Sequence, residues 1–313
     1  MPEANFLPAA DALAVWRDEL LTGAPPLLYP AGAGELAGVE IGPGLVTLIG
    51  GAPGAGKTAL TMQLLFDALR LTPELRAAVC SVEMSPGVLL DRQLARLSGV
   101  ALSLIRHRKL GAEHSQRIDQ ALATLEPLAD RLAFVRQPVD LANVAATADA
   151  FGAGLLVLDY VQRIPPPGEH GDRRGAVDAS MSYLRQFADA GVAVVVVAAV
   201  SRGRDGKGRS SYAEGLNLAS FRESSELEFG ADDAFLLLPD AGDPEAATLR
   251  HLKSRHGEPK DIELSFDRRL QRFTAAGARP APPDSKKLKA ALAALWRRTA
   301  PAREGQGEGE ADG

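Results

Sequence analysis

The eight residues from Gly51 to Thr58 have the types and spacing of a phosphate-binding loop. They read Gly-Ala-Pro-Gly-Ala-Gly-Lys-Thr and match the pattern of Gly, four residues, Gly-Lys-Thr at every position. In such a loop glycines let backbone N–H groups close around phosphate oxygens, the lysine reaches the β- and γ-phosphates, and the threonine hydroxyl binds Mg²⁺. The residues predicted to bind a nucleoside triphosphate are therefore Gly51, Ala52, Pro53, Gly54, Ala55, Gly56, Lys57 and Thr58.

The elements needed to position this loop flank it in the sequence. Residues 45–50 (Leu-Val-Thr-Leu-Ile-Gly) read as a buried strand, and residues 59–69 carry leucines at helical spacing. A strand that enters the loop and a helix that leaves it would aim N–H groups and the positive end of the helix dipole at phosphate. The alternative, a chance glycine-rich turn before a helix, does not account for the complete match of motif and flanks.

Two carboxylates could complete a hydrolytic site. Asp159 ends the aliphatic run Leu155–Leu158, at the rim where the loop is expected, and could hold Mg²⁺ against the nucleotide. Glu83 follows a second strand expected at residues 76–81. Because parallel strands end at one rim, Glu83 could face the γ-phosphate and deprotonate the attacking water. For Glu83 the pattern alone leaves an equal alternative, a surface acid favoured by the dipole of the next helix.

The composition is that of a globular chain with room for one large α/β domain. It has 313 residues, 46% of them hydrophobic and 24% charged, and a formal net charge of −5. Any contact with nucleic acid must therefore come from local basic patches. The single cysteine, Cys80, lies in an apolar run and reads as a buried thiol without an internal disulfide. No membrane-length apolar run and no secretory pattern at the start are visible, so a cytoplasmic location and no membrane partner are expected.

Alternating strand-like and helix-like segments up to residue 238 predict an α/β fold with a wound, mainly parallel sheet flanked by helices and a C-terminal antiparallel hairpin. The strands are expected at residues 45–50, 76–81, 132–135, 155–159, 192–200 and 233–238, and then, antiparallel, at 248–252, 262–266 and 270–273. The helices are expected at residues 9–22 and 59–69, in a helical region that begins at 86 and continues to about 128, and at 140–151, 176–190 and 218–229.

Basic residues gather on two segments that read as loops, one after a proline-rich turn and one rich in glycine at 201–217. Cations on such loops can follow a single-stranded phosphate backbone without reading its sequence. Solvated loops without a partner are the alternative. Because aromatic residues are few there, binding would be mainly electrostatic. The basic residues concerned are Arg173, Arg174, Arg202, Arg204, Lys207 and Arg209.

Five motifs together resemble those of DnaB-type replicative helicases and stand in the family's order. After the phosphate loop, Val82–Ser85 resembles the family's Ser-Leu-Glu-Met signature, and Leu158–Gln162 is similar to its Ile-Asp-Tyr-Leu-Gln. The segment from Phe221 to Asp232 is similar to its Leu-Arg-Glu-Ser-Gly…Ile-Glu…Ala-Asp segment, and Leu252–Gly257 resembles its Lys-x-Arg-x-Gly turn. The resemblance covers roughly residues 30–273 and implies a RecA-like P-loop ATPase motor domain.

The resemblance implies roles for individual residues. Glu83 would be the catalytic base, and Asp159 would direct Mg²⁺ beside ATP. Lys253 and Arg255 would act in trans, reaching from one subunit to the γ-phosphate held by the next. Two solvated charges at a hairpin are the alternative. The trans interpretation makes a monomer incomplete and implies a homo-oligomer, expected to be a hexameric ring.

The same resemblance places a DNA-binding loop at Arg222, Glu223 and Ser225, with single-stranded DNA as the partner. Two positions depart from the family. Ala199 stands where the family usually has a Gln that is thought to sense the γ-phosphate, and Ser225 stands where it usually has Gly. Coupling between hydrolysis and DNA movement is therefore an open question.

The expected organisation has five parts. They are an N-terminal linker helix at 1–30, the RecA-like motor domain at 31–274, a linker at 275–284, a basic amphipathic helix at 285–299 and a disordered acidic tail at 300–313. The N-terminal helix carries an apolar stripe with Trp16 and Leu20, which could pack on its own domain or on a neighbouring subunit. The family's helical collar domain is not expected in the 50 residues before the phosphate loop.

Three functions remain open at this point. The first is an ATP-dependent, DnaB-like DNA helicase or single-strand translocase in DNA replication. The second is a RecA-superfamily DNA-stimulated ATPase without unwinding, such as a recombination or loading factor. The third is a nucleotide-switched interaction module in which the basic helix at 285–299 binds a replication partner.

Overall fold

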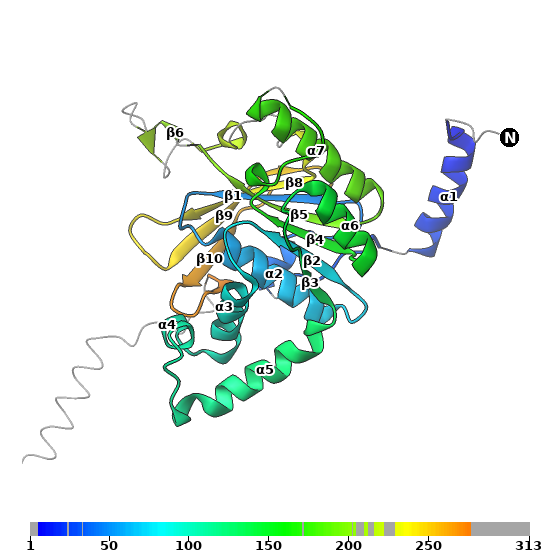
Figure 1. Cartoon of the computed structure of the whole chain (residues 1–313). Helices are drawn as coiled ribbons and strands as arrows, with labels where there is room; N and C mark the ends of the chain where they lie inside the picture. The colour runs from blue at the N-terminus through cyan, green and yellow to red at the C-terminus, as the bar shows by residue number, and fades with distance from the viewer. Residues whose placement is uncertain are drawn as a thin grey trace, which may run out of the picture. The chain divides into compact units, whose positions relative to one another are not determined.

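One nine-stranded sheet is the framework of the molecule (Figure 1), in the order β11-β10-β9-β8-β1-β5-β4-β2-β3. The computed structural model describes residues 6–23, 25–32, 34–170, 172–201, 203–204, 210–211, 216–221 and 229–276. The mutually parallel strands are β1 (Val46–Gly51), β2 (Ala77–Ser81), β3 (Leu132–Phe134), β4 (Leu155–Asp159), β5 (Ala193–Ala199) and β8 (Asp233–Pro239). The antiparallel strands are β9 (Ala246–Ser254), β10 (Ile262–Asp267) and β11 (Arg272–Ala275). The predicted fold class is confirmed.

Helices cover both faces of this sheet (Figure 1). One face carries α2 (Lys57–Leu71), α3 (Pro86–Ser98) and α5 (Ser115–Ala129), with the short α4 (Leu102–Arg106) beside α3. The other face carries α6 (Leu141–Phe151) and α7 (Arg173–Asp189). The remaining described elements are α1 (Ala9–Thr22), the two-residue strands β6 (Gly203–Arg204) and β7 (Ser210–Ser211), and the 3-10 turns η1 (Gly34–Gly38), η2 (Ala112–His114), η3 (Val161–Arg163) and η4 (Leu218–Ser220).

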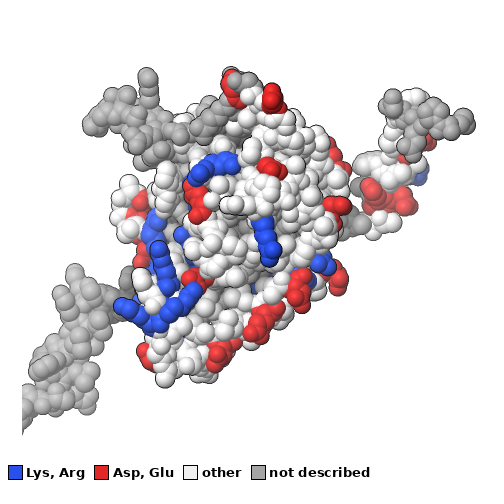
Figure 2. All heavy atoms as spheres, in the orientation of Figure 1, with Lys and Arg blue, Asp and Glu red and all other residues white. Residues whose placement is uncertain are grey.

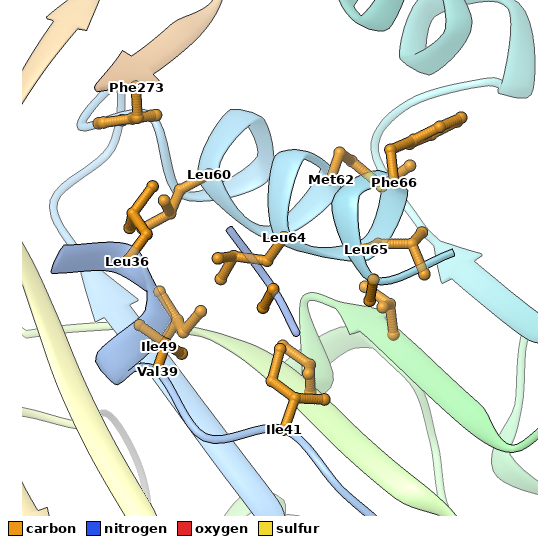
Figure 3. Close-up of a cluster of buried hydrophobic side chains, with 14 of the residues drawn as sticks. Leu36, Val39, Ile41, Ile49, Leu60, Met62, Leu64, Leu65, Phe66 and Phe273 are labelled. Carbon is orange, nitrogen blue, oxygen red and sulfur yellow. The ribbon is translucent and has the colours of Figure 1, made fainter. Parts of the chain in front are cut away.

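The apolar strands form these two layers because successive side chains point to opposite faces. Along β4, Leu155 and Val157 belong to the core cluster under α2, whereas Leu156 and Leu158 belong to the cluster under α6 and α7. Figure 3 shows leucines of α2 directed at the sheet beside Ile49. This packing holds the helix that follows the phosphate loop rigidly on β1.

Two expectations about local structure were wrong. Arg173 and Arg174 do not lie on a loop but in the first turn of α7, since the Asp172 side chain caps that helix by accepting from Gly175 N–H at 2.7 Å. The helix expected at 218–229 is also not present in its first part. There, η4 ends at Ser220, and Phe221 forms an antiparallel bridge with Val200 instead. Residues 222–228 lie outside the described residues.

The N-terminal helix was predicted correctly, but it has no buried residue. Its apolar side chains are more than half exposed, including Trp16 at 55% and Leu20 at 61%. Cys80 is a free, buried thiol, and burial raises its pKa to about 12. None of the described helices is long and apolar enough to cross a membrane. The linker, basic helix and acidic tail expected at 275–313 lie outside the described residues from 277 onward.

Candidate nucleotide-binding site

The phosphate loop connects β1 to α2 at the edge of the sheet where the parallel strands end. Gly54 and Gly56 have φ angles of +76° and +103°, which side chains other than glycine rarely adopt. Gly56 also lies close to two aromatic rings, since an added Cβ would lie 2.9 Å from Phe266 Cε1 and 3.0 Å from Phe273 Cζ. These constraints explain why glycine is needed at both positions. Ala55 is buried in the apolar core, and Ala52 packs against it, so their backbone is what they can offer a phosphate.

The two polar side chains that end the loop are held by nearby groups. Lys57 Nζ donates to the Gly51 carbonyl at 2.7 Å and to the Ala52 carbonyl at 3.0 Å. Burial lowers the pKa of Lys57, against the opposing charges of Asp159 and Glu83. Thr58 Oγ1 donates to Asp159 Oδ2 at 2.7 Å. The loop thus joins β4 through Thr58.

Asp159, at the end of β4, is 6% exposed. Burial raises its pKa; the Thr58 hydrogen bond and the charges of Lys57 and Arg92 oppose that shift, whereas Glu83 adds to it. Asp159 pairs in register with Ser81, and its carbonyl accepts from Val82 N–H at 2.8 Å. Glu83, in the loop between β2 and α3, is therefore carried to the same rim.

A cavity of about 440 Å³ joins these groups. It contains the predicted loop residues except Ala52 and Ala55, together with both predicted carboxylates, and so brings Lys57, Thr58, Glu83 and Asp159 into one site. Its lining residues are Gly51, Pro53, Gly54, Gly56, Lys57, Thr58, Glu83, Met84, Arg92, Asp159, Tyr160, Ala199, Val200, Phe266, Arg268 and Gln271.

Arg92 is a site residue that the sequence reasoning missed. It lies on α3, and its Nε atom is buried without a hydrogen-bond partner in the part of the chain that the structure describes. Burial lowers the pKa of the guanidinium, and the charge of Asp159 opposes that effect. The signal was present in the sequence, because Arg92 falls at helical spacing from the buried Leu89 and Arg96. A cation on the buried stripe of a helix indicates a nearby anion.

Arg268 was also missed, because it comes from the distant turn between β10 and β11. Its Nη1 donates to the Gly54 carbonyl at 2.8 Å, and its guanidinium lies 5.1 Å from the centre of the Phe266 ring. Only the antiparallel extension of the sheet brings this turn over the phosphate loop.

Lys253 and Arg255 are not part of this cavity within one chain. Lys253 Nζ donates to the carbonyls of Phe229 at 3.1 Å and Ala231 at 2.7 Å, and Arg255 Nη1 lies 2.8 Å from Asp232 Oδ1. Ser254 pairs with Asp233 at the start of β8, whereas Gly51 pairs with Leu237. Four residues of strand, about 13 Å, separate those pairs along the sheet. The two cations therefore lie toward the end of the sheet where β8 begins, whereas the phosphate loop lies at the end where the parallel strands finish.

Most of the predicted DNA-binding residues lie outside the described part of the chain. Arg173 and Arg174 lie in α7 and Arg204 in β6. The face in Figure 2 shows acidic and basic side chains interspersed, with acidic ones along α5. The predicted residues that lie outside the described ones are Arg202, Lys207, Arg209, Arg222, Glu223 and Ser225.

A glycine loop at the end of a central parallel strand, with Thr58 joined to a carboxylate on a nearby strand, defines the class as a P-loop ATPase domain with a RecA-like fold. The chain belongs to the DnaB-like helicase C-terminal domain family, whose family model matches residues 37–275.

Two curated proteins are similar to this chain in sequence. A Chlamydia trachomatis protein named "probable plasmid replicative DNA helicase" is 23% identical over 257 residues, which is 79% of this chain and 54% of that protein. Its counterpart in Chlamydia muridarum is 22% identical over 246 residues, covering 76% and 52%. This chain thus spans about half the length of the curated relatives it matches.

Solved structures agree on the fold. One solved ATPase domain superposes with a TM-score of 0.74 at 17% identity, covering 87% of this chain and 99% of that one. A DnaB-like replicative helicase, solved in a study of its interactions with primase, gives a TM-score of 0.71 at 16% identity, covering 87% and 67%.

Proposed function

We propose that this chain is the motor of a DnaB-like helicase, which hydrolyses ATP to move along single-stranded DNA in replication. The observation that carries the proposal is the convergence of Lys57, Thr58, Glu83 and Asp159 on one cavity. Family membership supports the same activity.

The residues of the cavity suit hydrolysis of a β–γ phosphate bond. Lys57 is close enough to the loop to bind the β- and γ-phosphates once it leaves the loop carbonyls. Glu83 takes a proton from the attacking water, whose oxygen bonds to the γ-phosphorus as the bond to the bridging oxygen breaks. Arg92, half-buried with its Nε atom shielded from solvent, offers a positive charge to the phosphates from the same chain.

Thr58 and Asp159 would hold Mg²⁺. Their oxygens lie 2.7 Å apart, and hydroxyl and carboxylate oxygens are ligands that this ion prefers. The residues fit a metal bound mainly through nucleotide phosphates and water, since the described residues contain no group of three or more His, Cys, Asp or Glu that could hold a metal ion alone. When bound, Mg²⁺ neutralises charge that develops on the phosphate oxygens.

The site is completed by a neighbouring subunit. Because Lys253 and Arg255 lie toward the opposite sheet edge from the loop of their own chain, they can serve only the nucleotide of another copy. The assembly proposed is a homo-oligomer, a hexameric ring in which each interface contains one such site.

The exposed N-terminal helix supports this assembly. Leu13, Trp16 and Leu20 are exposed and are not covered by any other element in the described part of the chain. A groove of about 310 Å³ between α2, α3 and α5 offers a complementary apolar surface, lined by Phe66, Leu90, Leu94, Leu122, Leu125, Leu128 and others. We assign this groove to the N-terminal helix of a second copy, and not to the helix's own domain.

The DNA partner would be held by the predicted basic and loop residues, from Arg173 and Arg174 to Arg222, Glu223 and Ser225. A replication partner at the helix of residues 285–299 and a cytoplasmic location stay predictions.

ATPase rate, measured with and without single-stranded DNA over a range of protein concentrations, tests the proposal. We expect DNA to stimulate the rate, and we expect the rate per subunit to rise with concentration as interfaces form. Glu83→Gln should bind ATP but hydrolyse it about 10²–10⁴ times more slowly. A rate indifferent to both DNA and concentration would rule the helicase motor out.

A non-unwinding ATPase is the second candidate, because Ala199 has no hydrogen-bonding side chain at the cavity wall. DNA-stimulated hydrolysis without displacement of a labelled strand from a forked duplex would favour it. The third candidate, a nucleotide-switched module, depends on residues beyond 276; deletion of 277–313 with partner binding intact would end it.

A further inference from the structure

Gln162 holds the backbone of Ala199 through both ends of its side-chain amide. Gln162 Nε2 donates to the Ala199 carbonyl at 3.0 Å, and Gln162 Oε1 accepts from Ala199 N–H at 3.1 Å. Gln162 lies in η3, three residues after Asp159. Register pairing between β4 and β5 ends at Asp159 and Val197, so the amide continues the sheet where the backbone of β4 has turned away.

Ala199 lies between this amide and the phosphate loop. It is the last residue of β5 and pairs with Gly51 on its other side. Ala199 and Val200 line the nucleotide cavity. Because the Ala199 side chain is a methyl group, the polar atoms of this residue are its backbone N–H and carbonyl, and Gln162 binds both.

The residues after Ala199 continue to Phe221, the last described residue before the predicted DNA loop. Val200 bridges Phe221, and Ser201 donates to the Ser220 carbonyl from its N–H at 2.7 Å and from its hydroxyl at 3.1 Å. Phe221 is buried against β1, since a Cβ added to Gly50 would lie 2.4 Å from Phe221 Cε1. The position of Phe221 thus depends on the end of β5.

We propose that Gln162 is a positioning residue that transmits a change at Asp159 to Phe221. This inference rests on the proposed function and deepens it. Asp159 shifts as its partners change between ATP and ADP, and η3 follows because it is three residues away. Two reciprocal hydrogen bonds resist both separation and rotation, so the Ala199 peptide must move with Gln162. Val200 and Ser201 then shift the strand that holds Phe221.

The chain contains a matched control. Gln63 on α2 makes the same reciprocal contact with Phe273, since its Nε2 donates to the Phe273 carbonyl and its Oε1 accepts from Phe273 N–H, both at 2.9 Å. Its target is Phe273 of β11, whose ring lies beside Gly56 of the phosphate loop and not on the segment from Gln162 to Phe221. Gln63→Leu therefore removes the same two hydrogen bonds without touching the connection from Asp159 to Phe221.

The experiment measures the affinity of the full chain for a fluorescent oligothymidine, once with a slowly hydrolysed ATP analogue and once with ADP. The wild type should bind the oligothymidine with a different affinity in each of the two nucleotide states. Gln162→Leu should reduce the ratio of these two affinities about fivefold, the effect of losing one to two net hydrogen bonds, with basal ATPase within about twofold. Gln162→Glu, which keeps the bond from Ala199 N–H and loses the donation to the carbonyl, should give an intermediate ratio. Gln63→Leu should keep the wild-type ratio, although it lowers the melting temperature.

Two results would overturn the inference. One is that Gln162→Leu keeps the wild-type ratio of DNA affinities, which would mean that the Gln162 amide only satisfies the backbone at the end of β5. The other is an equal loss in Gln63→Leu, which would mean that any loss of stability reduces the ratio. A wild type whose DNA affinity ignores the nucleotide, or that does not bind DNA, would instead contradict the proposed function, and the inference with it.

Discussion

Two charged groups at opposite ends of the parallel strands, Arg92 beside Asp159 and Asp232 at the other end, differ in how completely the protein supplies their partners. Where β1 and β4 end, Arg92 Nε has no hydrogen-bond partner among the described residues, and the pKa of Asp159 is raised by burial. Where β8 begins, Asp232 is 2% exposed and both of its carboxylate oxygens have partners, whereas Oδ2 of the neighbouring Asp233 is buried without a hydrogen-bond partner among the described residues. Asp232 accepts from Val46 N–H at 2.8 Å and Arg185 at 2.6 Å, and it pairs with Arg255 at 2.8 Å.

We call the end of the sheet with Arg92 and Asp159 the binding edge, and the end with Asp232 the supporting edge. Buried charges that lack partners in the protein raise its energy until a ligand supplies counter-charges, and for that reason perturbed groups gather at functional sites. Buried charges with complete partners hold structure instead. The supporting edge has a second task, because its Asp232 holds Arg255, which is proposed to serve the neighbouring subunit.

The largest expected effect is on hydrolysis across the interface. Arg255→Ala should lower kcat of the assembled protein by about 10³-fold or more, because an arginine finger stabilises the transition state. Nucleotide affinity of the isolated chain should change little. Mixing this variant with Glu83→Gln chains should restore part of the activity, since some interfaces would combine an intact Glu83 with an intact Arg255. No recovery on mixing would contradict a trans role.

The supporting edge should respond in stability and not in ligand affinity. Asp232→Ala leaves Arg185 and the Val46 N–H without their shared partner and should cost about 3–5 kcal/mol of unfolding free energy. Urea unfolding measures this loss, and nucleotide titration below the transition provides the comparison. A weakened nucleotide affinity in the folded variant would mean that the two edges are not independent.

At the binding edge, Arg92→Gln should weaken binding of an ATP analogue about tenfold relative to ADP, because a charge-assisted hydrogen bond to the γ-phosphate is lost. Arg117→Gln, an exposed arginine on α5, is the control with the same change of charge. Isothermal titration calorimetry with the ATP analogue and with ADP measures the two affinities of each variant. Equal weakening for the two would assign Arg92 a structural role only.

The smallest effect concerns the stability cost of Asp159. Its pKa is raised in the folded state, so the folded protein resists ionisation of this carboxyl. The neutral Asp159 carboxyl costs no stability at low pH. The free energy of unfolding then falls as the pH rises from the unfolded pKa of about 3.9 through the higher folded pKa. Asp159→Asn removes this cost and should raise the melting temperature by about 2–4 °C at pH 7, with no gain near pH 4.

Thermal unfolding from pH 4 to pH 8 measures that difference, and the same variant should lose Mg²⁺-dependent hydrolysis. A stabilisation that does not depend on pH would show that side-chain size, and not charge, is the cause.

Much of the fold was predictable because local patterns and tertiary packing agree. The strands β2, β4 and β5 are short aliphatic runs buried on both faces, and Asp140 caps α6 as expected, accepting from Asn143 N–H at 2.8 Å. The first part of the helix expected at 218–229 is absent for the opposite reason. Its propensity was outweighed at Phe221, where the ring fills the space above Gly50 and the backbone pairs with Val200.

For the candidate site, the division follows the range of each interaction. The residues themselves determined the phosphate loop, because its glycines and the following helix are local in sequence. Their order also carried Glu83 and Asp159 to one rim, because parallel strands share an edge. Helical spacing marked Arg92 as a cation on a buried helix face. Only the tertiary structure decided that this face meets the cavity, that Arg268 enters it, and that Lys253 and Arg255 do not. Those placements depend on strand pairing and helix packing between segments distant in the chain, which residue types and spacing do not encode.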